Sequence, residues 1–253
     1  MSGQTTENGA DKMLDLKGKK ALVTGSSQGM GKEIAKMLSD SGATVYAHGS
    51  HMSDKLAEAA KYIGTDKIAV ADLYDNDAAT RLYEVTGGVD ILILNASVQY
   101  KRDWDEFSDE ELDRQIVINI KSTYQMMKTF APYMKEKKWG RIINIGSVNQ
   151  YNNHPQLLIY GVTKAADMKL VEGVAKSLAP FGITVNNIAP GAINTPRNSE
   201  ALSDADFLKK VEASIPAGYV GDAMAINGAV ALLCEEKSYI TGSEIIADGG
   251  MHL

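Results

Sequence analysis

Short runs rich in valine, isoleucine and leucine alternate with helical stretches along almost the whole 253-residue chain. The runs that predict strands are KKALVTG, ATVYAHG, KIAVADL, VDILILNAS, GRIINIGS, ITVNNIAPG and SEIIADGG. The segments that predict helices include GKEIAKMLSDSG, SDKLAEAAKYIG, NDAATRLYEVTG, a long region over about residues 109–137, YGVTKAAD with its continuation to about residue 179, and DAMAINGAVALLCEE. Apolar strands separated by helices are typical of a parallel sheet covered on both faces. We predict a doubly wound α/β fold with about seven parallel strands.

Nothing in the chain resembles a linker or a repeat, so we expect one domain over residues 14–253. The polar start, MSGQTTENGADK, lacks the apolar region of a secretory signal, and we interpret residues 1–13 as a disordered tail. No apolar run is long enough to span a membrane. A formal net charge of −6 argues against a nucleic-acid or membrane partner. The single cysteine, Cys234, fits a cytoplasmic protein and lies in an apolar run that predicts an inert, buried thiol.

A glycine-rich turn, VTGSSQGMGKE, connects the first predicted strand to the first helix. Gly25, Gly29 and Gly31 permit a tight turn and close approach of the backbone to a pyrophosphate at the positive end of the helix. A P-loop does not fit, because Gly25 and Gly31 enclose five residues instead of four and Glu33 replaces the magnesium-binding hydroxyl. The turn alone could be a connection without a ligand, but its pattern favours a dinucleotide.

The end of the second predicted strand bears on which dinucleotide is bound. An acidic side chain there would bind the ribose 2′-hydroxyl of NAD and repel the 2′-phosphate of NADP. The chain has Gly49, Ser50 and His51 at this point. The missing repulsion, a hydroxyl and an imidazole favour NADP(H) over NAD(H), although we expect no arginine or lysine in this clamp.

The segment YGVTKAAD places Tyr160 and Lys164 one turn apart on the same helix face. In a core this pair would be costly, whereas in a cleft the ammonium group would make the phenol more acidic and useful for proton transfer. Ser147 ends the preceding strand, but Ile145 and Asn149 replace the glycines of a hydrolase nucleophile elbow. The four histidines include no i, i+4 pair, and we expect no metal site.

In combination, these motifs resemble the short-chain dehydrogenase/reductase family. The matching pieces are TGSSQGMG, LNAS, Asn119, Ser147, YGVTK, APGAINTP and YITGSEIIADGG, which cover the chain from about Lys19 to the C-terminus. Each piece is unspecific alone, but their order and spacing are specific. The resemblance implies a Rossmann-like fold and hydride transfer between nicotinamide and a carbonyl or secondary alcohol. Two departures are Ser97, where the family has a glycine near the cofactor, and Tyr219, where it has an arginine.

The resemblance also implies a role for each matching residue. Tyr160 would be the general acid/base, and Lys164 would bind the nicotinamide ribose and lower the pKa of the phenol. Ser147 would hydrogen-bond the reacting oxygen, and Asn119 would hold a water that links Lys164 to solvent. Asp72 would contact adenine. The implied cofactor-binding residues are Gly25, Ser27, Gln28, Gly29, Met30, Gly31, Ser50, His51, Asp72, Leu73, Asn95, Ala96, Tyr160, Lys164, Pro190, Gly191, Ile193 and Thr195.

The residues expected to face the substrate follow the ends of the catalytic strands and are rich in amides. They are Gln99, Ser147, Asn149, Tyr151 and Tyr160, with Val98, Val148, Gln150, Asn152, His154 and Leu157 beside them. Such a lining suits a sugar, polyol or other small polar ketone. A 3-oxoacyl-[acyl-carrier-protein] reductase is the alternative enzyme, with MKEKKWGR and Lys176 as a basic docking surface. A catalytically silent dinucleotide sensor or scaffold is the alternative from another class.

Two further expectations concern the assembly and the cover of the cleft. The resemblance implies that the long helices and the C-terminal strand pair between subunits, and we expect a homotetramer of D2 symmetry, or else a dimer. Residues 194–217 follow the cofactor-binding segment and are polar and irregular. With Pro196 and Pro216 bracketing them, they predict a mobile lid.

Overall fold

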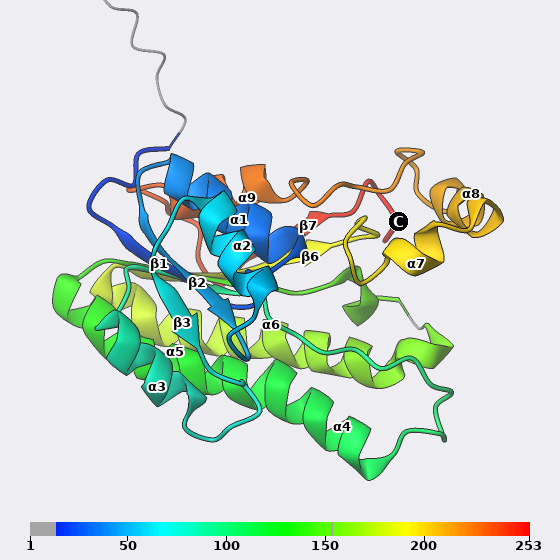
Figure 1. Cartoon of the computed structure of the whole chain (residues 1–253), viewed down its shortest axis with the longest axis horizontal. Helices are drawn as coiled ribbons and strands as arrows, with labels where there is room; N and C mark the ends of the chain where they lie inside the picture. Colours follow the sequence, from blue (N-terminus) through cyan, green and yellow to red (C-terminus); the bar gives the residue numbers. More distant parts are fainter. Residues whose placement is uncertain (1–13, 153) are drawn as a thin grey trace, which may run out of the picture.

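Seven parallel strands form a single sheet in the order β3-β2-β1-β4-β5-β6-β7 (Figure 1). The computed structural model describes residues 14–152 and 154–253, so the expected tail, residues 1–13, lies outside the described residues. The strands are β1 (Lys20–Val23), β2 (Thr44–Gly49), β3 (Ile68–Val70), β4 (Ile91–Leu94), β5 (Gly140–Ile145), β6 (Ile183–Pro190) and β7 (Glu244–Ala247). The chain winds outward from β1 in one direction and from β4 in the other. The predicted doubly wound parallel sheet is therefore confirmed.

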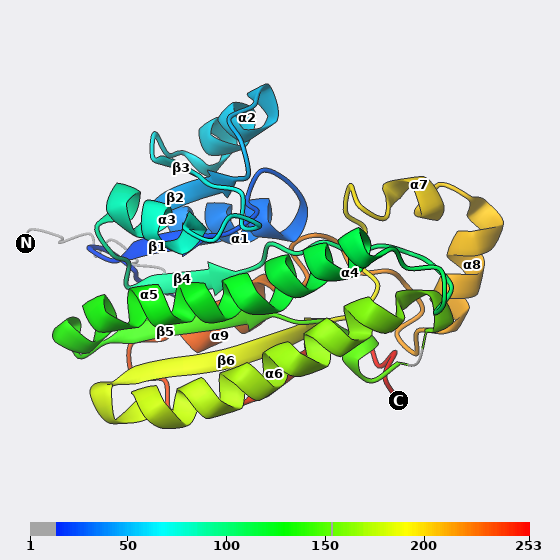
Figure 2. The ribbon, with the colours of Figure 1, turned by 90° about the horizontal axis from the view of Figure 1, so that it is seen from below.

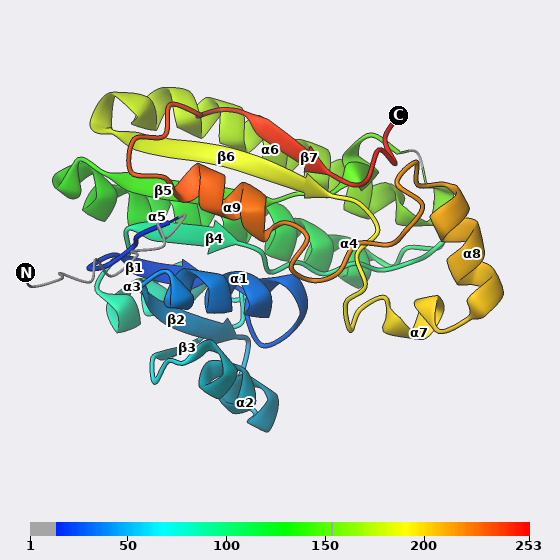
Figure 3. The ribbon, with the colours of Figure 1, turned by 90° about the horizontal axis from the view of Figure 1, so that it is seen from above.

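Helices cover both faces of the sheet, as strands that are apolar on both faces require. One face carries α3 (Ala78–Thr86), α4 (Asp109–Gln115), α5 (Ser122–Lys137) and α6 (Leu158–Leu178) (Figure 2). The other carries α1 (Gly29–Asp40), α2 (Asp54–Ile63) and α9 (Asn227–Cys234) (Figure 3). The short helices α7 (Ser199–Leu202) and α8 (Ala205–Ala213) stand apart from both layers, at the end of the molecule to which the strands point (Figure 3).

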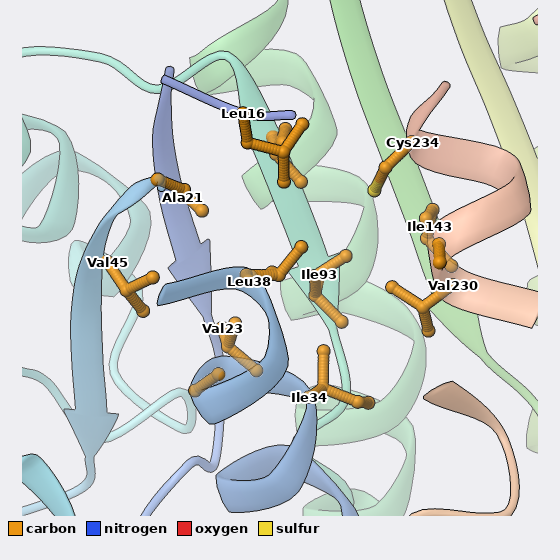
Figure 4. Close-up of a cluster of buried hydrophobic side chains, with 14 of the residues drawn as sticks. Leu16, Ala21, Val23, Ile34, Leu38, Val45, Ile93, Ile143, Val230 and Cys234 are labelled. Atoms are coloured by element: carbon orange, nitrogen blue, oxygen red, sulfur yellow. The ribbon is translucent and has the colours of Figure 1, made fainter. Parts of the chain in front are cut away.

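The sheet has a separate apolar core on each face. Successive side chains of a strand point to opposite faces, so Ile93 of β4 belongs to the cluster under α1 and α9 whereas Leu92 belongs to the cluster under α5 and α6. In the first cluster, Ile34 and Leu38 of α1 pack towards the sheet together with Val230 of α9 (Figure 4). Burial of these side chains holds the strand ends in fixed positions relative to one another.

The long helical region predicted over residues 109–137 is present, but it is not a uniform α-helix. Ser108 caps α4 through a capping box with Glu111. A six-residue π-helical segment, Ile116–Lys121, then joins α4 to α5. Segments of π-helix are rare and occur often at functional sites, and this one contains Asn119.

The structure bears on three further expectations from the sequence, which concern the cysteine, a membrane span and a metal site. Cys234 is a free, buried cysteine, and burial raises the pKa of its thiol to about 12. This agrees with the predicted inert thiol. Within residues 14–152 and 154–253, no helix is long and apolar enough to cross a membrane, and the same residues include no cluster of histidine, cysteine, aspartate and glutamate that could hold a metal ion.

Candidate active site

A cleft of about 850 Å³ opens where the parallel strands end. Segments that follow β1, β2, β3, β4, β5 and β6 all contribute to its walls. Ligands of open α/β sheets bind at this edge, beside the reversal of winding, which here lies between β1 and β4. Of the residues predicted to bind a cofactor, those that line the cleft are Gly25, Ser27, Gln28, Gly29, Met30, Gly31, Ser50, Asp72, Leu73, Asn95, Ala96, Tyr160, Pro190, Gly191, Ile193 and Thr195.

Two glycines of the glycine-rich turn, Gly25 and Gly31, occupy positions that do not suit a larger residue. Gly25 has a φ of +66°, in the left-handed region that favours glycine. A Cβ on Gly31 would come within 2.4 Å of the Asn95 side-chain nitrogen and 2.5 Å of the Gly25 carbonyl oxygen. The turn is thus compact because two glycines and Asn95 pack against one another, and its backbone stays open to the cleft.

His48, which the sequence analysis did not assign to the site, holds this turn in place. It is 2% exposed, at the end of β2. Its Nδ1 accepts a hydrogen bond from the Gly25 N–H at 2.9 Å, and its Nε2 lies 3.1 Å from the Ala71 carbonyl oxygen. Burial lowers the pKa of His48 to about 4, so the ring is neutral and carries its proton on Nε2. No motif marks such a histidine, because its role arises only when β1, β2 and β3 lie side by side.

The buried face of α6 brings Tyr160 to the wall of the cleft and Lys164 beneath it. Both side chains are buried, with 5% and 2% exposure. Nζ of Lys164 lies 5.8 Å from the centroid of the Tyr160 ring. The same nitrogen donates to the Ile145 carbonyl oxygen at 2.9 Å and pairs with Asp167 Oδ2 at 3.3 Å. The pair therefore lies at the boundary between the cleft and the interior.

Ser147 lies on the same cleft, immediately after β5. Its Oγ accepts hydrogen bonds from the backbone N–H and the side-chain Nδ2 of Asn149, at 3.1 and 3.2 Å. Both bonds use lone pairs of the hydroxyl, so its own hydrogen is left to donate to an oxygen atom in the cleft.

Asn119 does not line the cleft but supports it from behind. Its side-chain amide accepts from the Val98 N–H and donates to the Val98 carbonyl, both at 2.9 Å, and donates to Thr163 Oγ1 at 3.1 Å. These bonds connect the loop after β4 to α6 next to Lys164. None of them goes to Lys164 itself, so the predicted water-mediated link stays a prediction.

A lysine that the sequence analysis did not consider lies beside the glycine-rich turn. Nζ of Lys55, in the first turn of α2, donates to Oε1 of Gln28. Both Gln28 and Ser50 line the cleft. Lys55 was missed because it belongs to the helix that follows the clamp and not to the end of β2.

Besides Asn119 and Lys164, three residues that the sequence analysis placed at the site do not line the cleft, namely His51, Gln150 and Tyr151. His51 is exposed, and its Nδ1 lies 3.0 Å from Ser50 Oγ. Tyr151, placed at the substrate by the sequence analysis, is 49% exposed, and its hydroxyl donates to the carboxylate of Glu244 in β7. The carboxylate draws the phenol towards the sheet edge. Gln150 makes the same contact, with Nε2 2.7 Å from Glu244 Oε1. The substrate-side residues that do line the cleft are Val98, Gln99, Ser147, Val148, Asn149, Asn152, His154, Leu157 and Tyr160.

The sequence analysis predicted that residues 194–217 are irregular. The structure shows instead that they contain α7 and α8. The cleft has an apolar wall formed by Leu202, Phe207 and Val211. The sequence analysis missed this wall because its few apolar residues are divided between two short helices. Across the cleft, Nη2 of Arg197 donates to the carbonyl oxygen of Ser97 at 2.7 Å. The segment thus contacts the loop after β4, and its mobility stays a prediction.

A glycine turn beside the reversal of winding suits a dinucleotide, and a phenol above a buried ammonium suits proton transfer. Together they define the class of dinucleotide-dependent oxidoreductases. The family described as enoyl-(acyl carrier protein) reductase matches residues 25–252. The chain belongs to the short-chain dehydrogenase/reductase family, whose members act on CH–OH groups with a nicotinamide cofactor.

Relatives with different substrates align along nearly the whole chain. The 3beta-hydroxysteroid dehydrogenase 1 of Eggerthella lenta is 34% identical over 94% of this chain and 95% of its own length. The 3-oxoacyl-[acyl-carrier-protein] reductase of Haemophilus influenzae is 37% identical over 94% of this chain and all of its own length.

The solved structures that resemble this chain also carry names that point to different substrates. A 3-oxoacyl (acyl-carrier-protein) reductase from Agrobacterium tumefaciens with NADP bound has a TM-score of 0.89 and 33% identity, and covers 93% of this chain and 95% of its own. A gluconate 5-dehydrogenase from Burkholderia cenocepacia in complex with NADP and tartrate has a TM-score of 0.86 and 29% identity, and covers 94% of this chain and 96% of its own.

We expect His48→Asn to reduce the acid sensitivity of the fold. The pKa of His48 is lowered from 6.5 to about 4, so the unfolded chain binds a proton that the folded chain does not. Stability is therefore lost as the pH falls from about 6.5 through about 4, by about 3 kcal/mol in total. Asparagine keeps an acceptor for Gly25 but does not titrate. Urea denaturation at a series of pH values should show a shallower loss of the free energy of unfolding in the variant.

The exposed neighbour His51 provides the matched control. His51→Asn should follow the parent protein over the same pH range. Parallel curves for the parent and His48→Asn would show that the buried imidazole does not contribute to acid unfolding.

Proposed function

We propose that this protein is an NADP(H)-preferring dehydrogenase or reductase of small hydroxylated carbonyl compounds. The observation that carries the proposal is that Tyr160 and Ser147 line one cleft, with Lys164 buried beneath the phenol. A catalytically silent sensor would have no need for a buried ammonium group there, because removing a charge from water costs free energy. The retained pair therefore supports catalysis over the sensor alternative.

The residues around the cleft suit a nicotinamide dinucleotide. A Cβ on Gly29 would lie 3.5 Å from Thr195, so the glycine-rich turn and the segment after β6 approach each other closely where they line the cleft. Gly25 and Gly31 keep the same turn compact, and Asp72 and Asn95 line the adjoining wall. We assign the cofactor roles of the residues lining this space on that basis.

The proposed chemistry transfers a hydride and a proton. When bound, the nicotinamide supplies or accepts the hydride. Tyr160 gives a proton to the substrate oxygen during reduction and takes it back during oxidation. Ser147 donates a hydrogen bond to the same oxygen and stabilises the charge that develops on it.

The substrate side of the cleft supports a polar substrate. Asn149, Asn152 and Gln99 supply amides, and Lys101 and His154 add groups that can bind a carboxylate or hydroxyls. The gluconate 5-dehydrogenase described above is a relative that acts on a sugar acid, as its name states. We propose sugar acids and related hydroxylated ketones as the first substrates to examine.

The alternative acyl-carrier-protein substrate is less well supported by the placement of basic residues. Lys135 and Lys137 lie in the last turn of α5, directly before β5, and Lys176 lies in the last turn of α6. These turns adjoin the amino ends of β5 and β6, whereas the cleft opens at the carboxyl ends. Arg141 is 2% exposed and donates to the carbonyls of residues 235 and 236. The basic cluster therefore faces away from the site that an acyl chain must enter.

The preference for NADP(H) is supported by Lys55. An ammonium at the start of α2, bonded to Gln28 beside the cleft, can pair with a 2′-phosphate. Ser50 lines the same end of the cleft and can donate a hydrogen bond. None of the four residues between β2 and α2 is acidic, so no carboxylate stands directly after the strand to repel the phosphate.

We propose a homotetramer of D2 symmetry in the cytoplasm. On the layer of α4, α5 and α6, exposed apolar side chains gather along the helices. They are Ile116 (41% exposed), Tyr124 (48%), Leu158 (45%) and Val162 (55%). The strand β7 forms one edge of the sheet, and Leu253 beyond it is 95% exposed. Two separate apolar surfaces suit the two contacts of such a tetramer.

We expect a panel of sugar-derived ketones, sugar acids, polyols, a steroid and an acyl thioester to show turnover with the hydroxylated compounds. In Tyr160→Phe the ring remains but the proton donor is lost, so turnover should fall by ~10²–10⁴-fold while NADPH still binds. Lys164→Ala should lose both turnover and cofactor binding. Nicotinamide absorbance and NADPH fluorescence measure the two effects.

The control for this experiment is Tyr83→Phe, a tyrosine of α3 that packs against Phe130 away from the cleft. Its turnover should equal that of the parent. Full activity in Tyr160→Phe would defeat the mechanism, and turnover confined to the acyl thioester would favour the carrier-protein substrate.

Lys55→Ala should weaken NADPH binding by roughly tenfold to a hundredfold, the value of a charge-assisted hydrogen bond, and leave NADH binding unchanged. Lys61→Ala removes an exposed lysine from the last turn of the same helix and should affect neither. Ser50→Asp should reverse the order of the two affinities. Gly49→Asp is a poorer test, since a Cβ there would lie 3.1 Å from Leu56. Tighter binding of NADH than of NADPH by the parent protein would refute the preference.

Sedimentation velocity at micromolar concentration should show a tetramer. Val162→Glu places a charge on the α6 surface and should reduce the assembly to dimers, because one of the two apolar contacts is lost. A parent protein that sediments as a monomer would contradict the proposed assembly.

A further inference from the structure

The buried face of α6 changes character along the helix. Its C-terminal half, through Val171, Ala175 and Leu178, belongs to the apolar core. Its N-terminal half carries Lys164 and Asp167, whose side chains are 3% and 0% exposed. Acidic residues are almost never buried to this depth unless they are paired. The burial of Asp167 therefore requires an explanation other than packing.

Asp167 is bonded to the ammonium group of the site. Its Oδ2 lies 3.3 Å from Nζ of Lys164, while its buried Oδ1 has no hydrogen-bond partner among the residues that the structure describes. The other acceptor at Nζ is the carbonyl oxygen of Ile145, at 2.9 Å. Of these two acceptors, only the carboxyl group can carry a compensating charge.

A row of polar side chains leads from Asp167 across the sheet. Asn144 of β5 pairs in register with Asn187 of β6, which pairs with Glu244 of β7. Nδ2 of Asn144 donates to Oδ1 of Asn187 at 2.7 Å, and Nδ2 of Asn187 donates to Glu244. Strand side chains alternate between faces, so Asn187 faces α6 together with Val185. The sheet thus presents neutral amides to Asp167, and the next acid lies two strands further away.

The titratable group beside Asp167 on its own helix is Lys164. The sheet presents the neutral Asn144 of β5 to it, followed by Asn187 on β6 and Glu244 on β7. Burial raises the pKa of Asp167 against the opposing effects of Lys164 and Asn144. Its carboxyl group therefore ionises at a higher pH than that of an exposed aspartate, and the ion pair forms as the pH rises.

We propose that Asp167 is a positioning residue that keeps the Lys164 ammonium charged and directed at the cleft at alkaline pH. The proposal rests on the proposed role of Lys164 in binding the cofactor ribose. Without the carboxylate, the buried ammonium has only the Ile145 carbonyl as a partner, and an uncompensated buried charge is costly. Oxidation of an alcohol releases a proton and is favoured at alkaline pH, so the pair preserves the site where that direction is easiest.

Asp167→Asn tests the proposal because it removes the charge and keeps the shape. NADPH fluorescence titrations of the parent and the variant should give dissociation constants that draw together as the pH falls, because protonation of the Asp167 carboxyl group removes the charge that the amide lacks. At pH 9 the variant should bind about tenfold more weakly than the parent, because the buried Lys164 ammonium has lost its carboxylate partner. With an identified substrate, the pH optimum of oxidation should also move to lower pH in the variant.

Asp90→Asn is the matched control. Asp90 is 8% exposed and accepts a hydrogen bond from the Lys20 N–H at 2.8 Å, directly before β4 and at the opposite end of the sheet from the cleft. Its NADPH binding should follow the parent at every pH. Thermal unfolding verifies that each variant is folded, and Asp167→Ser serves in place of Asp167→Asn if the latter is not.

Two results would overturn the proposal. Binding by Asp167→Asn that follows the parent from pH 6 to pH 9 would give Asp167 a structural role only. Binding that is weaker by the same factor at every pH would point to geometry rather than charge. Both results are measured by cofactor binding alone, so they do not depend on the substrate class or on Tyr160. A parent protein that fails to bind either nicotinamide cofactor would instead refute the proposed function.

Discussion

All seven strands of the sheet run in the same direction, and this constraint decides where the molecule can carry out chemistry. Both faces of the sheet are covered by helices and filled largely with apolar side chains, so most polar groups gather at its edges. The carboxyl ends of the strands all meet at one edge, where six connecting segments line a single cleft. The reversal of winding between β1 and β4 separates the helices on the two sides and leaves space for a dinucleotide there.

Helix α6 serves the core and the site with one continuous face. Residues spaced three or four apart point towards the sheet along its whole length. Near the cleft these residues are Tyr160, Lys164 and Asp167, and further on they are apolar. The apolar half secures the helix on the sheet, and this rigid support holds the polar half in position. The cost of burying an ammonium group is met by a carbonyl and a carboxylate that the same packing brings within reach.

The fold and the central part of the site were predictable from the sequence because they depend on local patterns. Apolar runs predicted the strands, and the spacing of Tyr160 and Lys164 predicted a shared face. Features that depend on distant segments were not predictable. His48 supports the glycine-rich turn from the neighbouring strand, and Lys55 approaches Gln28 from the next helix. Tyr151 follows the catalytic strand closely, yet a carboxylate on β7, ninety-three positions away along the chain, turns it from the cleft.

The two walls of the cleft are held by different kinds of contact. On the substrate side, Gln150 and Tyr151 are hydrogen-bonded to Glu244, which is itself connected through Asn187 to the interior of the sheet. On the other side, α7 and α8 contact the loop after β4 through an exposed arginine, and among their residues none is fully buried. Exposed polar contacts are exchanged for water at little cost, whereas a buried polar network is not. We therefore expect a ligand to enter on the side of α7 and α8, with Ser147 and Tyr160 keeping the geometry that the proposed proton transfer requires.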